Sequence, residues 1–183
     1  WSLGFVDDLF KIKARWKLLG QLVLAIFAIQ TGFAIEHLKG PFFQEINLGF
    51  MVWPITILWI VTIMNAINLI DGLDGLAGGI VTTVLITLGV ILWSSGSLPL
   101  LLVIMSLFGA VIGFLLFNRS PALTFMGDSG SLFLGCILAT FSLEIAASSG
   151  KNILAHDYVY SLQRLFELRM SFLEKVIGFD AIL

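Results

Sequence analysis

Three short polar clusters interrupt this apolar chain, and each of them places aspartate close to glycine. Asp7 and Asp8 lie in the first cluster, Asp71 and Asp74 in the second, and Asp128 in the third. A carboxylate beside a membrane segment is energetically costly and is rarely found there without a functional role. The clusters therefore predict one site for a metal ion and phosphate groups, assembled from separated segments of the chain.

The second cluster repeats polar side chains at every third position. Asn65, Asn68, Asp71 and Asp74 follow this spacing, which keeps neighbouring side chains within reach of each other along the end of a helix. A glycine after each aspartate allows the backbone to turn or to approach a ligand closely. Ordinary helix capping is the alternative, because Asn, Asp and Gly all favour helix ends. Four such groups exceed the needs of one cap, so we favour a binding site.

In the first cluster, two adjacent carboxylates precede a basic residue. In a regular helix or strand, Asp7 and Asp8 cannot both point at the same spot, so we expect one to bind metal and the other to act on a substrate oxygen. Lys17 and Gln21 follow at a spacing of four, on one face of the next helix. Such charges are also common in solvated loops beside membranes, so this cluster alone is weak support.

The third cluster places a carboxylate between glycines and beside hydroxyl groups. Asp128 is followed by Ser129 and Ser131, and Asn118 and Phe125 lie on the same short stretch. A glycine-flanked acid can offer a hard oxygen ligand to a metal and exposed backbone N–H groups to an anion. A plain turn between helices would not need so many polar and aromatic groups.

The histidines argue against a zinc site. Neither His37 nor His156 has a metal-ligating neighbour at a useful spacing. Oxygen ligands favour Mg²⁺, which prefers a few carboxylates together with substrate phosphates to a complete protein cage, and Mn²⁺ would serve similarly.

The composition is that of a polytopic membrane protein. Hydrophobic residues make up 58% of the chain and charged residues 12%, and the mean hydropathy is +1.03; charged residues alone are about a quarter of a soluble domain. No basic region supports binding to nucleic acid. Cys136 stands alone in an apolar run, which predicts a small buried side chain.

Apolar stretches predict an all-α fold, a bundle of about five membrane-spanning helices. A helix needs about 20 apolar residues to cross the hydrocarbon. Five stretches qualify: Leu18–Ile35, Leu48–Met64, Gly78–Trp93, Leu98–Phe117 and Ser131–Ala147.

The order of these spans places the three clusters on one side of the membrane, because two spans separate each cluster from the next. The cations near the clusters are Lys11, Lys13, Arg15, Lys17 and Arg119, whereas the opposite loops before the C-terminal tail offer Lys39 alone. The positive-inside rule then makes the side with the clusters cytoplasmic.

The character of the chain changes near its end. We expect residues 1–147 to form a membrane-embedded core and residues 148–183 to form an atypical tail with an amphipathic helix, which either lies on a membrane surface or is not a natural continuation of the chain. The chain starts at Trp1 without an initiator Met, and we interpret it as a fragment.

Three ordered motifs together resemble the polyprenyl-phosphate N-acetylhexosamine-1-phosphate transferase family, which includes the phospho-N-acetylmuramoyl-pentapeptide transferase of peptidoglycan synthesis. The motifs are GFVDD with Lys17 and Gln21 downstream, NAINLIDGLDGLAGG, and FNRSPALTFMGDSGSLFLG. The resemblance implies a bacterial plasma-membrane enzyme with a cytoplasmic active site. Such an enzyme moves a sugar 1-phosphate from a UDP-sugar onto polyprenyl phosphate and releases UMP, in cell-envelope glycan synthesis.

The resemblance also implies roles for single residues. Asp128 would hold Mg²⁺ with Asp8 near the ion, Asp7 would handle the lipid phosphate, and Lys17 would be available to a phosphate. The groups expected to line the substrate pocket are Asn65, Asn68, Asp71, Asp74, Asn118 and Phe125, the last stacking on uracil. Because a phosphate monoester is already mostly ionised at pH 7, we expect Asp7 to orient the acceptor more than to deprotonate it.

Details of the motifs favour the N-acetylglucosamine-1-phosphate branch, with the pentapeptide transferase as the alternative. The connection from Asp8 to Lys17 is short, and the pentapeptide branch usually has a longer insertion there. Two departures weaken the transfer of activity: nothing after Gly135 matches the family's histidine-rich motif, and its first helices are absent. We expect this chain by itself to be poorly active or inactive.

Three other classes of membrane protein fit the motifs less well. CDP-alcohol phosphotransferases want an arginine shortly after the first Asp-Gly, which this chain lacks, and aromatic prenyltransferases lack the third motif. A transporter would place its acids near the bilayer midplane on broken helices, whereas these acids lie at the ends of spans. The apolar faces of the helices permit a homodimer.

Overall fold

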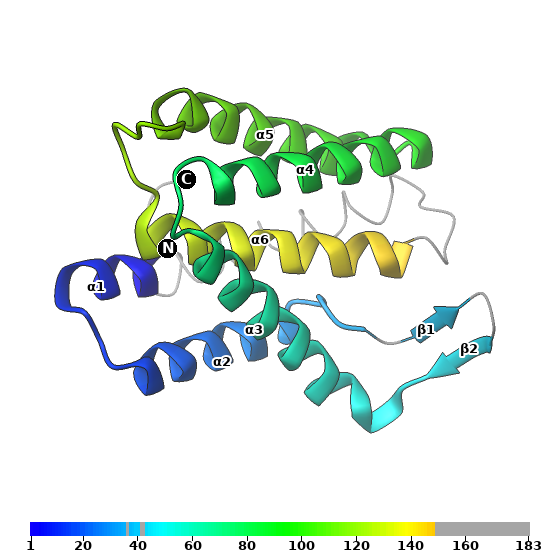
Figure 1. Cartoon of the computed structure of the whole chain (residues 1–183). Helices are drawn as coiled ribbons and strands as arrows, with labels where there is room; N and C mark the ends of the chain where they lie inside the picture. Colours follow the sequence, from blue (N-terminus) through cyan, green and yellow to red (C-terminus); the bar gives the residue numbers. More distant parts are fainter. Residues whose placement is uncertain (36, 41–42, 149–183) are drawn as a thin grey trace, which may run out of the picture.

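The computed structural model describes residues 1–35, 37–40 and 43–148. The elements in chain order are α1 (Ser2–Phe10), α2 (Ala14–Gln30), β1 (His37–Gly40), β2 (Phe43–Asn47), η1 (Gly49–Met51), α3 (Val52–Ile70), α4 (Leu76–Ser95), α5 (Leu98–Asn118) and α6 (Gly127–Ser148). The long helices run beside one another (Figure 1). The predicted amphipathic helix of the tail lies outside the described residues.

The prediction of a membrane helix bundle is confirmed. Among the described residues, four helical segments are long and apolar enough to cross a membrane: Gly49–Ile70, Leu76–Ser95, Leu98–Asn118 and Gly127–Ala146. They correspond to four of the five predicted spans. The first predicted span corresponds to α2, which has 17 residues and therefore a length of about 26 Å. It ends earlier than predicted, where Thr31 and Gly32 close the last turn.

One element departs from the all-α prediction. β1 and β2 pair as an antiparallel hairpin between α2 and α3, with His37 opposite Asn47 and Leu38 opposite Ile46. In Figure 1 this hairpin lies at the end of the molecule opposite to α1. The sequence did not reveal the hairpin, because four- and five-residue strands are too short to show a clear apolar period.

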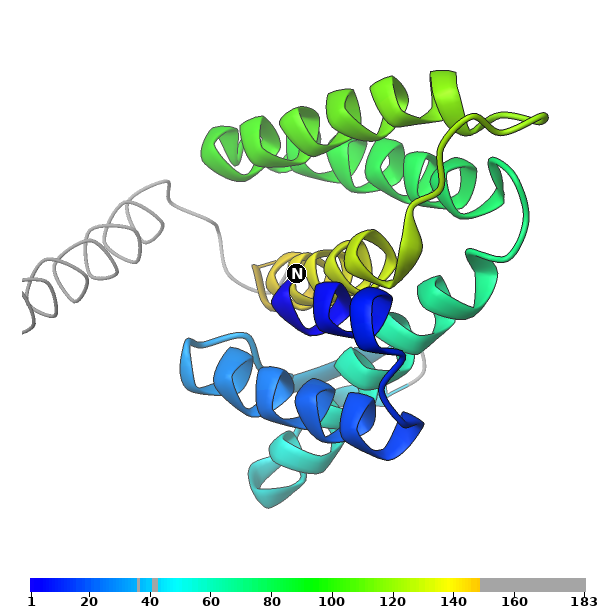
Figure 2. The same ribbon diagram turned by 90° about the vertical axis from the view of Figure 1, so that its left-hand side faces the viewer.

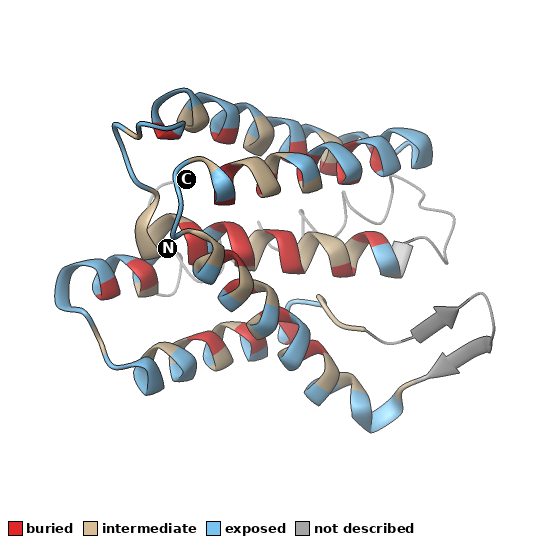
Figure 3. Cartoon of the chain, in the orientation of Figure 1, coloured by how far each residue is buried: buried red, intermediate tan, exposed pale blue. Residues whose placement is uncertain are grey.

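The central helix of the bundle is α6. Its buried side chains contribute to two clusters, one with α4 and α5 and the other with α2 and α3. In Figure 3 the buried residues form stripes on the facing sides of these helices, whereas α5 is largely exposed on its outer side. α6 is therefore buried within the bundle. The exposed face of α5 is broad and apolar, and such a face is suited to contact with lipid.

Close contacts between helix backbones bring the elements together at one end. A Cβ atom added to Gly135 of α6 would lie 2.7 Å from the Cα atom of Met64 in α3. A Cβ atom on Gly4 of α1 would lie 2.2 Å from the carbonyl oxygen of Asp128, at the start of α6. Helices can approach this closely only where one of them has no side chain, so these glycines set the distances on which the site depends.

Candidate active site

The three aspartate clusters meet at one end of the bundle. α1, the end of α3, the start of α4 and the start of α6 gather there, and Figure 2 looks at this end directly. Asp7 and Asp8 lie within α1 and Asp128 lies in the first turn of α6. The helical placement fixes these carboxylates more firmly than a loop would.

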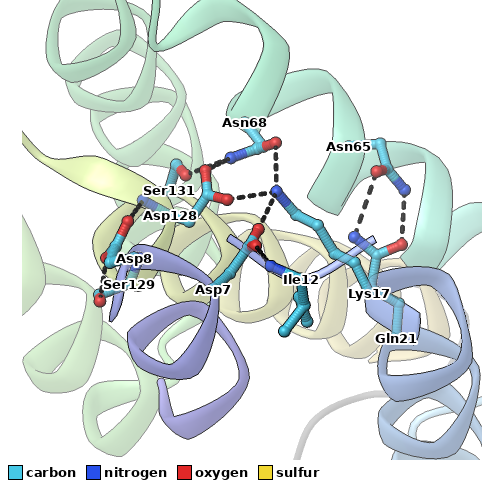
Figure 4. A network of polar contacts seen from close by, with 10 residues as sticks. All are labelled: Asp7, Asp8, Ile12, Lys17, Gln21, Asn65, Asn68, Asp128, Ser129 and Ser131. Atoms are coloured by element: carbon cyan, nitrogen blue, oxygen red, sulfur yellow. Dashed lines mark hydrogen bonds and ion pairs between the residues drawn. The ribbon is translucent and has the colours of Figure 1, made fainter. Parts of the chain in front are cut away.

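Lys17 is the centre of the contacts. Its ammonium group lies 3.0 Å from Oδ2 of Asp7, donates to Oδ1 of Asn68 at 3.0 Å and pairs with Oδ2 of Asp128. Figure 4 shows these groups converging from α1, α2, α3 and α6. An ammonium group has three N–H donors, so this arrangement uses all three of them.

Asn68 orients the carboxylate of Asp128. The Asn68 amide donates to Oδ1 of Asp128 and to Oγ of Ser131, the latter at 2.9 Å. Ser131 is fully buried. Asp128 is therefore held on one oxygen by an amide from α3 and on the other by the lysine from α2.

Asp8 is bound to the N-terminus of α6. Its two carboxylate oxygens accept hydrogen bonds from the backbone N–H groups of Asp128 and Ser129, at 2.8 and 2.9 Å, and from the Ser129 hydroxyl. Desolvation raises the pKa of Asp8, but these hydrogen bonds outweigh it and hold the pKa below its ordinary value. A carboxylate at a helix N-terminus also interacts favourably with the helix dipole.

Asp7 is 8% exposed, and both of its oxygens are engaged. Oδ1 accepts the backbone N–H of Ile12 at 2.9 Å, and Oδ2 pairs with Lys17. The first of these bonds fixes the turn that leads from α1 to α2, so Asp7 links the path of the chain to the position of the lysine.

Asp71 lies at the end of α3 and faces the other carboxylates. Burial and repulsion by Asp128 and Asp8 raise the pKa of Asp71 to about 6, despite a hydrogen bond from the backbone of Gly127. The site therefore carries more negative charge than its one lysine neutralises. Four carboxylates against one ammonium group give a net charge of −3 when all are ionised.

The excess negative charge of the site raises the question of whether these carboxylates could hold the predicted Mg²⁺ ion. Within the described part of the chain, no group of three or more His, Cys, Asp or Glu side chains is arranged to hold a metal ion by itself. Asp8 and Asp128 are neighbouring acids, since Asp8 accepts the backbone N–H of Asp128 and is repelled by its charge. All four carboxylate oxygens accept hydrogen bonds from the chain, so a metal ion would replace some of these bonds. Such a donor set fits Mg²⁺, which takes one or two carboxylates and completes its shell with water and phosphate.

Asn65 lies apart from the carboxylates, although we expected it to line the substrate pocket. Its amide exchanges two hydrogen bonds with the Gln21 amide, at 2.7 and 3.1 Å, and also donates to the carbonyl oxygen of Val61. Figure 4 shows this pair beside the Lys17 cluster, joined to it through α2 and α3.

Asn118 and Asp74 secure the loop between α5 and α6. Asn118 is 3% exposed; its side chain accepts the backbone N–H of Gly75 at 3.0 Å and donates to the carbonyl oxygen of Thr124 at 2.8 Å. Asp74 accepts the backbone N–H of Ala122 at 3.1 Å. Both residues thus bind backbone, which the motif spacing did not reveal.

An open groove with about 610 Å³ of accessible space lies next to this loop. Its lining includes Asp74, Gly75 and Arg119, together with leucine and isoleucine side chains of α4 and α5. Phe125, on the same loop, is 75% exposed.

Two residues that position the site were not predicted to do so. Gly4 was noted beside Asp7 and Asp8, but its contact with the backbone of Asp128 could not be read from the sequence. Ser131 was noted as a hydroxyl near an anion site and instead accepts a hydrogen bond from Asn68. The sequence shows only that Gly4 lies one helical turn before the paired carboxylates, which does not identify its partner.

Comparison with known proteins agrees with the motifs. A family model described as glycosyl transferase family 4 matches residues 1–146 of the chain. The chain belongs to glycosyl transferase family 4. The match includes every residue of the cluster around Lys17, and it ends inside α6.

Several curated relatives in glycosyl transferase family 4 are similar to the chain. A probable undecaprenyl-phosphate N-acetylglucosaminyl 1-phosphate transferase from Bacillus subtilis (strain 168) is 45% identical over 142 residues, covering 77% of the chain and 40% of the relative. Phospho-N-acetylmuramoyl-pentapeptide-transferases from Geobacillus sp. (strain WCH70) and Enterococcus hirae are 41% and 36% identical over 154 and 153 residues. These alignments cover 77% and 78% of the chain, and 47% and 48% of the relatives. The chain thus spans half or less of the length of these relatives.

Proposed function

We propose that the complete protein transfers a sugar 1-phosphate, N-acetylglucosamine 1-phosphate, from a UDP-sugar to polyprenyl phosphate and releases UMP. The observation that carries the proposal is the convergence of Asp7, Asn68 and Asp128 on Lys17, with Asp8 bound beside them to the start of α6. Family membership and the name of the Bacillus subtilis relative support the type of reaction. Cell-envelope glycan synthesis is the process that this reaction would serve.

The chemistry requires positive charge, because the reaction brings two phosphate-bearing substrates together. Lys17 is the cation that this part of the chain provides at the cluster. A Mg²⁺ or Mn²⁺ ion bound by Asp128 and Asp8 would neutralise phosphate oxygens and polarise the transferred group. The carboxylates of the cluster outnumber its one ammonium group, which is consistent with the binding of an additional cation.

In this proposal Lys17 binds a substrate phosphate by exchanging one of its present partners. All three of its donors are used by Asp7, Asp128 and Asn68. A phosphate oxygen can replace a carboxylate in a charge-assisted hydrogen bond of similar strength. Because Asp7 is fixed to Ile12, it keeps the lysine in place during this exchange.

For Asp7 we propose an orienting role rather than that of a general base. The acceptor phosphate is already largely ionised near neutral pH, and both Asp7 oxygens are engaged. The Asp7→Asn variant should therefore lose UMP release at every pH between 6 and 9. A variant that keeps a near-normal rate at high pH and fails at low pH would establish a base.

The groove beside Asp74 is our candidate for the nucleotide site. It is lined mostly by apolar side chains and carries the Arg119 cation, and the exposed Phe125 belongs to the loop that follows Arg119. Aromatic stacking on a base contributes about 1–3 kcal/mol. Phe125→Ala should therefore raise KM for the UDP-sugar about tenfold, while Phe125→Tyr should leave KM unchanged.

The test of the proposed function is UMP release by the complete protein in detergent or lipid. UDP-N-acetylglucosamine, polyprenyl phosphate and Mg²⁺ are supplied together, and each is omitted in turn. We expect UMP with all three and none without the acceptor. Uptake of a solute into vesicles without UMP formation would instead identify a transporter.

The donor decides between the two branches of the family. The Bacillus subtilis relative and the pentapeptide transferases differ in the sugar phosphate that their names state. We propose N-acetylglucosamine because identity to the former is higher, 45% against 36% and 41%. Product formation from UDP-N-acetylmuramoyl-pentapeptide but not from UDP-N-acetylglucosamine would assign the protein to the other branch.

We propose that the site faces the cytoplasm of a bacterial cell. Lys11, Lys13, Arg15 and Arg119 lie at the aspartate end of the bundle, and cations near spans favour the cytoplasmic side. A membrane-impermeant thiol reagent applied to intact cells should fail to label a cysteine placed at the exposed Leu123 and should label it after lysis. Labelling in intact cells would reverse the orientation.

A further inference from the structure

The pair of amides formed by Gln21 and Asn65 has no place in the chemistry proposed above. The Gln21 side chain is fully buried. Each amide donates to and accepts from the other, and the second N–H of Asn65 donates to the carbonyl oxygen of Val61. The oxygen atoms of both side chains are therefore occupied by protein, and the pair lies between α2 and α3.

These same two helices carry the groups that hold Asp128. Lys17 lies one turn before Gln21 on α2, and Asn68 lies one turn after Asn65 on α3. Residues three or four apart share a helix face. The Gln21–Asn65 pair and the Lys17–Asn68 pair are therefore consecutive contacts between the same two helices.

We propose that the Gln21–Asn65 pair is a positioning element that fixes the register of α2 against α3, so that Lys17 and Asn68 meet at Asp128. The kinetic part of this inference rests on the proposed transferase function, and the structural part does not. Neither amide is required to touch a substrate. The two residues act through the placement of Lys17 and Asn68.

Amides suit this task better than apolar side chains. Hydrophobic contacts are non-directional, so two apolar faces between α2 and α3 could slide by part of a turn with little change in burial. A reciprocal amide pair has one geometry in which both donors and both acceptors are satisfied, and a shift of one residue moves a helix by about 1.5 Å. Burying the pair therefore penalises any other register.

The structural test uses labels near the site at exposed positions. Trp16 and Leu69 are 58% and 84% exposed and adjoin Lys17 and Asn68 in the chain. Spin labels on cysteines at these two positions, in the complete protein with Cys136→Ala and no other reactive cysteine, report the distance between α2 and α3 by double electron–electron resonance. Gln21→Leu and Asn65→Leu should each shift or broaden the distance distribution by at least about 1.5 Å.

Two comparisons make the test specific. The double variant Gln21→Asn with Asn65→Gln exchanges the two amides and should restore the wild-type distribution. Thr56→Val is the matched control, because Thr56 is also fully buried in α3, but it accepts the backbone N–H of Ile35 away from the site. We expect Thr56→Val to lower stability and to leave the label distances unchanged.

The kinetic test measures UMP release by the same variants without labels. Gln21→Leu and Asn65→Leu should lower kcat about 10- to 100-fold, because displacing catalytic groups by about 1 Å has effects of this size. The same variants should change KM for the UDP-sugar less than about threefold, because in this proposal neither residue touches substrate. The exchanged double variant should recover kcat at least tenfold over the poorer single variant.

Unchanged distances in both leucine variants overturn the inference, whatever their activity. Changed distances with unchanged kcat overturn its kinetic part. Changed distances in a protein that never releases UMP sustain the positioning role and refute the transferase function instead. If the leucine variants fail to fold, Gln21→Asn alone is compared with the exchanged double variant, and absence of rescue overturns the inference.

Discussion

Replacing Gly4 by alanine tests the geometry of the site with one methyl group. The new Cβ atom would lie 2.2 Å from the carbonyl oxygen of Asp128 and 2.5 Å from the Cα atom of Ser129. Ordinary van der Waals contact begins at 3.4 Å. The obstacle is backbone, so no side chain can rotate away, and α1 and α6 must separate by about the 1.2 Å between those distances.

The separation acts on the carboxylates that α1 carries. Asp8 binds the backbone of Asp128 and Ser129 at 2.8 and 2.9 Å, and hydrogen bonds of this kind do not survive an added ångström at full strength. Overpacking costs about 1–3 kcal/mol of stability. Misplacing reacting groups by about 1 Å can cost about 100-fold in rate. We therefore expect Gly4→Ala to lose about 100-fold in kcat.

The assay is UMP release by the complete protein, paired with thermal unfolding in detergent. Gly109→Ala and Gly113→Ala are the controls, because a Cβ atom at either position meets nothing within 4 Å and both lie within helix α5. These variants should keep full activity and gain about 0.4–1 kcal/mol of stability. Wild-type kinetics for Gly4→Ala would refute the claim that close packing of α1 on α6 sets the site.

Three further predictions concern single groups. Asp71→Asn should stabilise the protein above pH 6: the folded state raises the pKa of Asp71 to about 6 from 3.8, so the penalty for ionising it is absent below about pH 4 and grows to its full size above pH 6. A shift of two pKa units corresponds to a penalty of about 3 kcal/mol, which screening by solvent reduces to about 1 kcal/mol. Thermal unfolding of the wild type and the variant at pH 4 and pH 8 measures this penalty. An equal effect of the substitution at both pH values would show that ionisation of Asp71 is not its cause. Asn118→Ala should lower stability by about 1–3 kcal/mol, because it leaves the N–H of Gly75 and the carbonyl of Thr124 without this partner; thermal unfolding measures the change, and unaltered stability would contradict the role of Asn118. Removing divalent ions with EDTA should abolish UMP release, and Mg²⁺ or Mn²⁺ should restore it; thermal stabilisation by Mg²⁺ that persists in Asp128→Asn would contradict the assignment of that ligand.

The sequence was sufficient to predict the spans and the meeting of the aspartates at one end. Apolar length alone predicted five spans, and four of them correspond to helices of the described residues that are long and apolar enough to cross a membrane. Counting two spans between successive clusters placed Asp7, Asp71 and Asp128 at the same end, and the helices gather there in Figure 1. Both inferences depend on the membrane, which restricts helices to few arrangements.

What the sequence could not give was the identity of each partner. Asn65 and Asn68 occupy the same kind of position in one motif, yet one binds Gln21 and the other binds Asp128. Spacing places a residue on a helix face, but which neighbour meets that face depends on the crossing of two helices. For the same reason, the contact of Asn118 with Gly75 is a tertiary contact that no local pattern predicts.

The central claim is that groups from separate helices act as one catalytic site. A double-mutant cycle on UMP release with Lys17→Met and Asp128→Asn tests it most directly. Each single variant should lose at least about 100-fold in kcat/KM, and the double variant should lie within about threefold of the poorer single variant, because removing either group already disables the unit. Losses that multiply in the double variant, or a single variant with normal activity, would contradict the account.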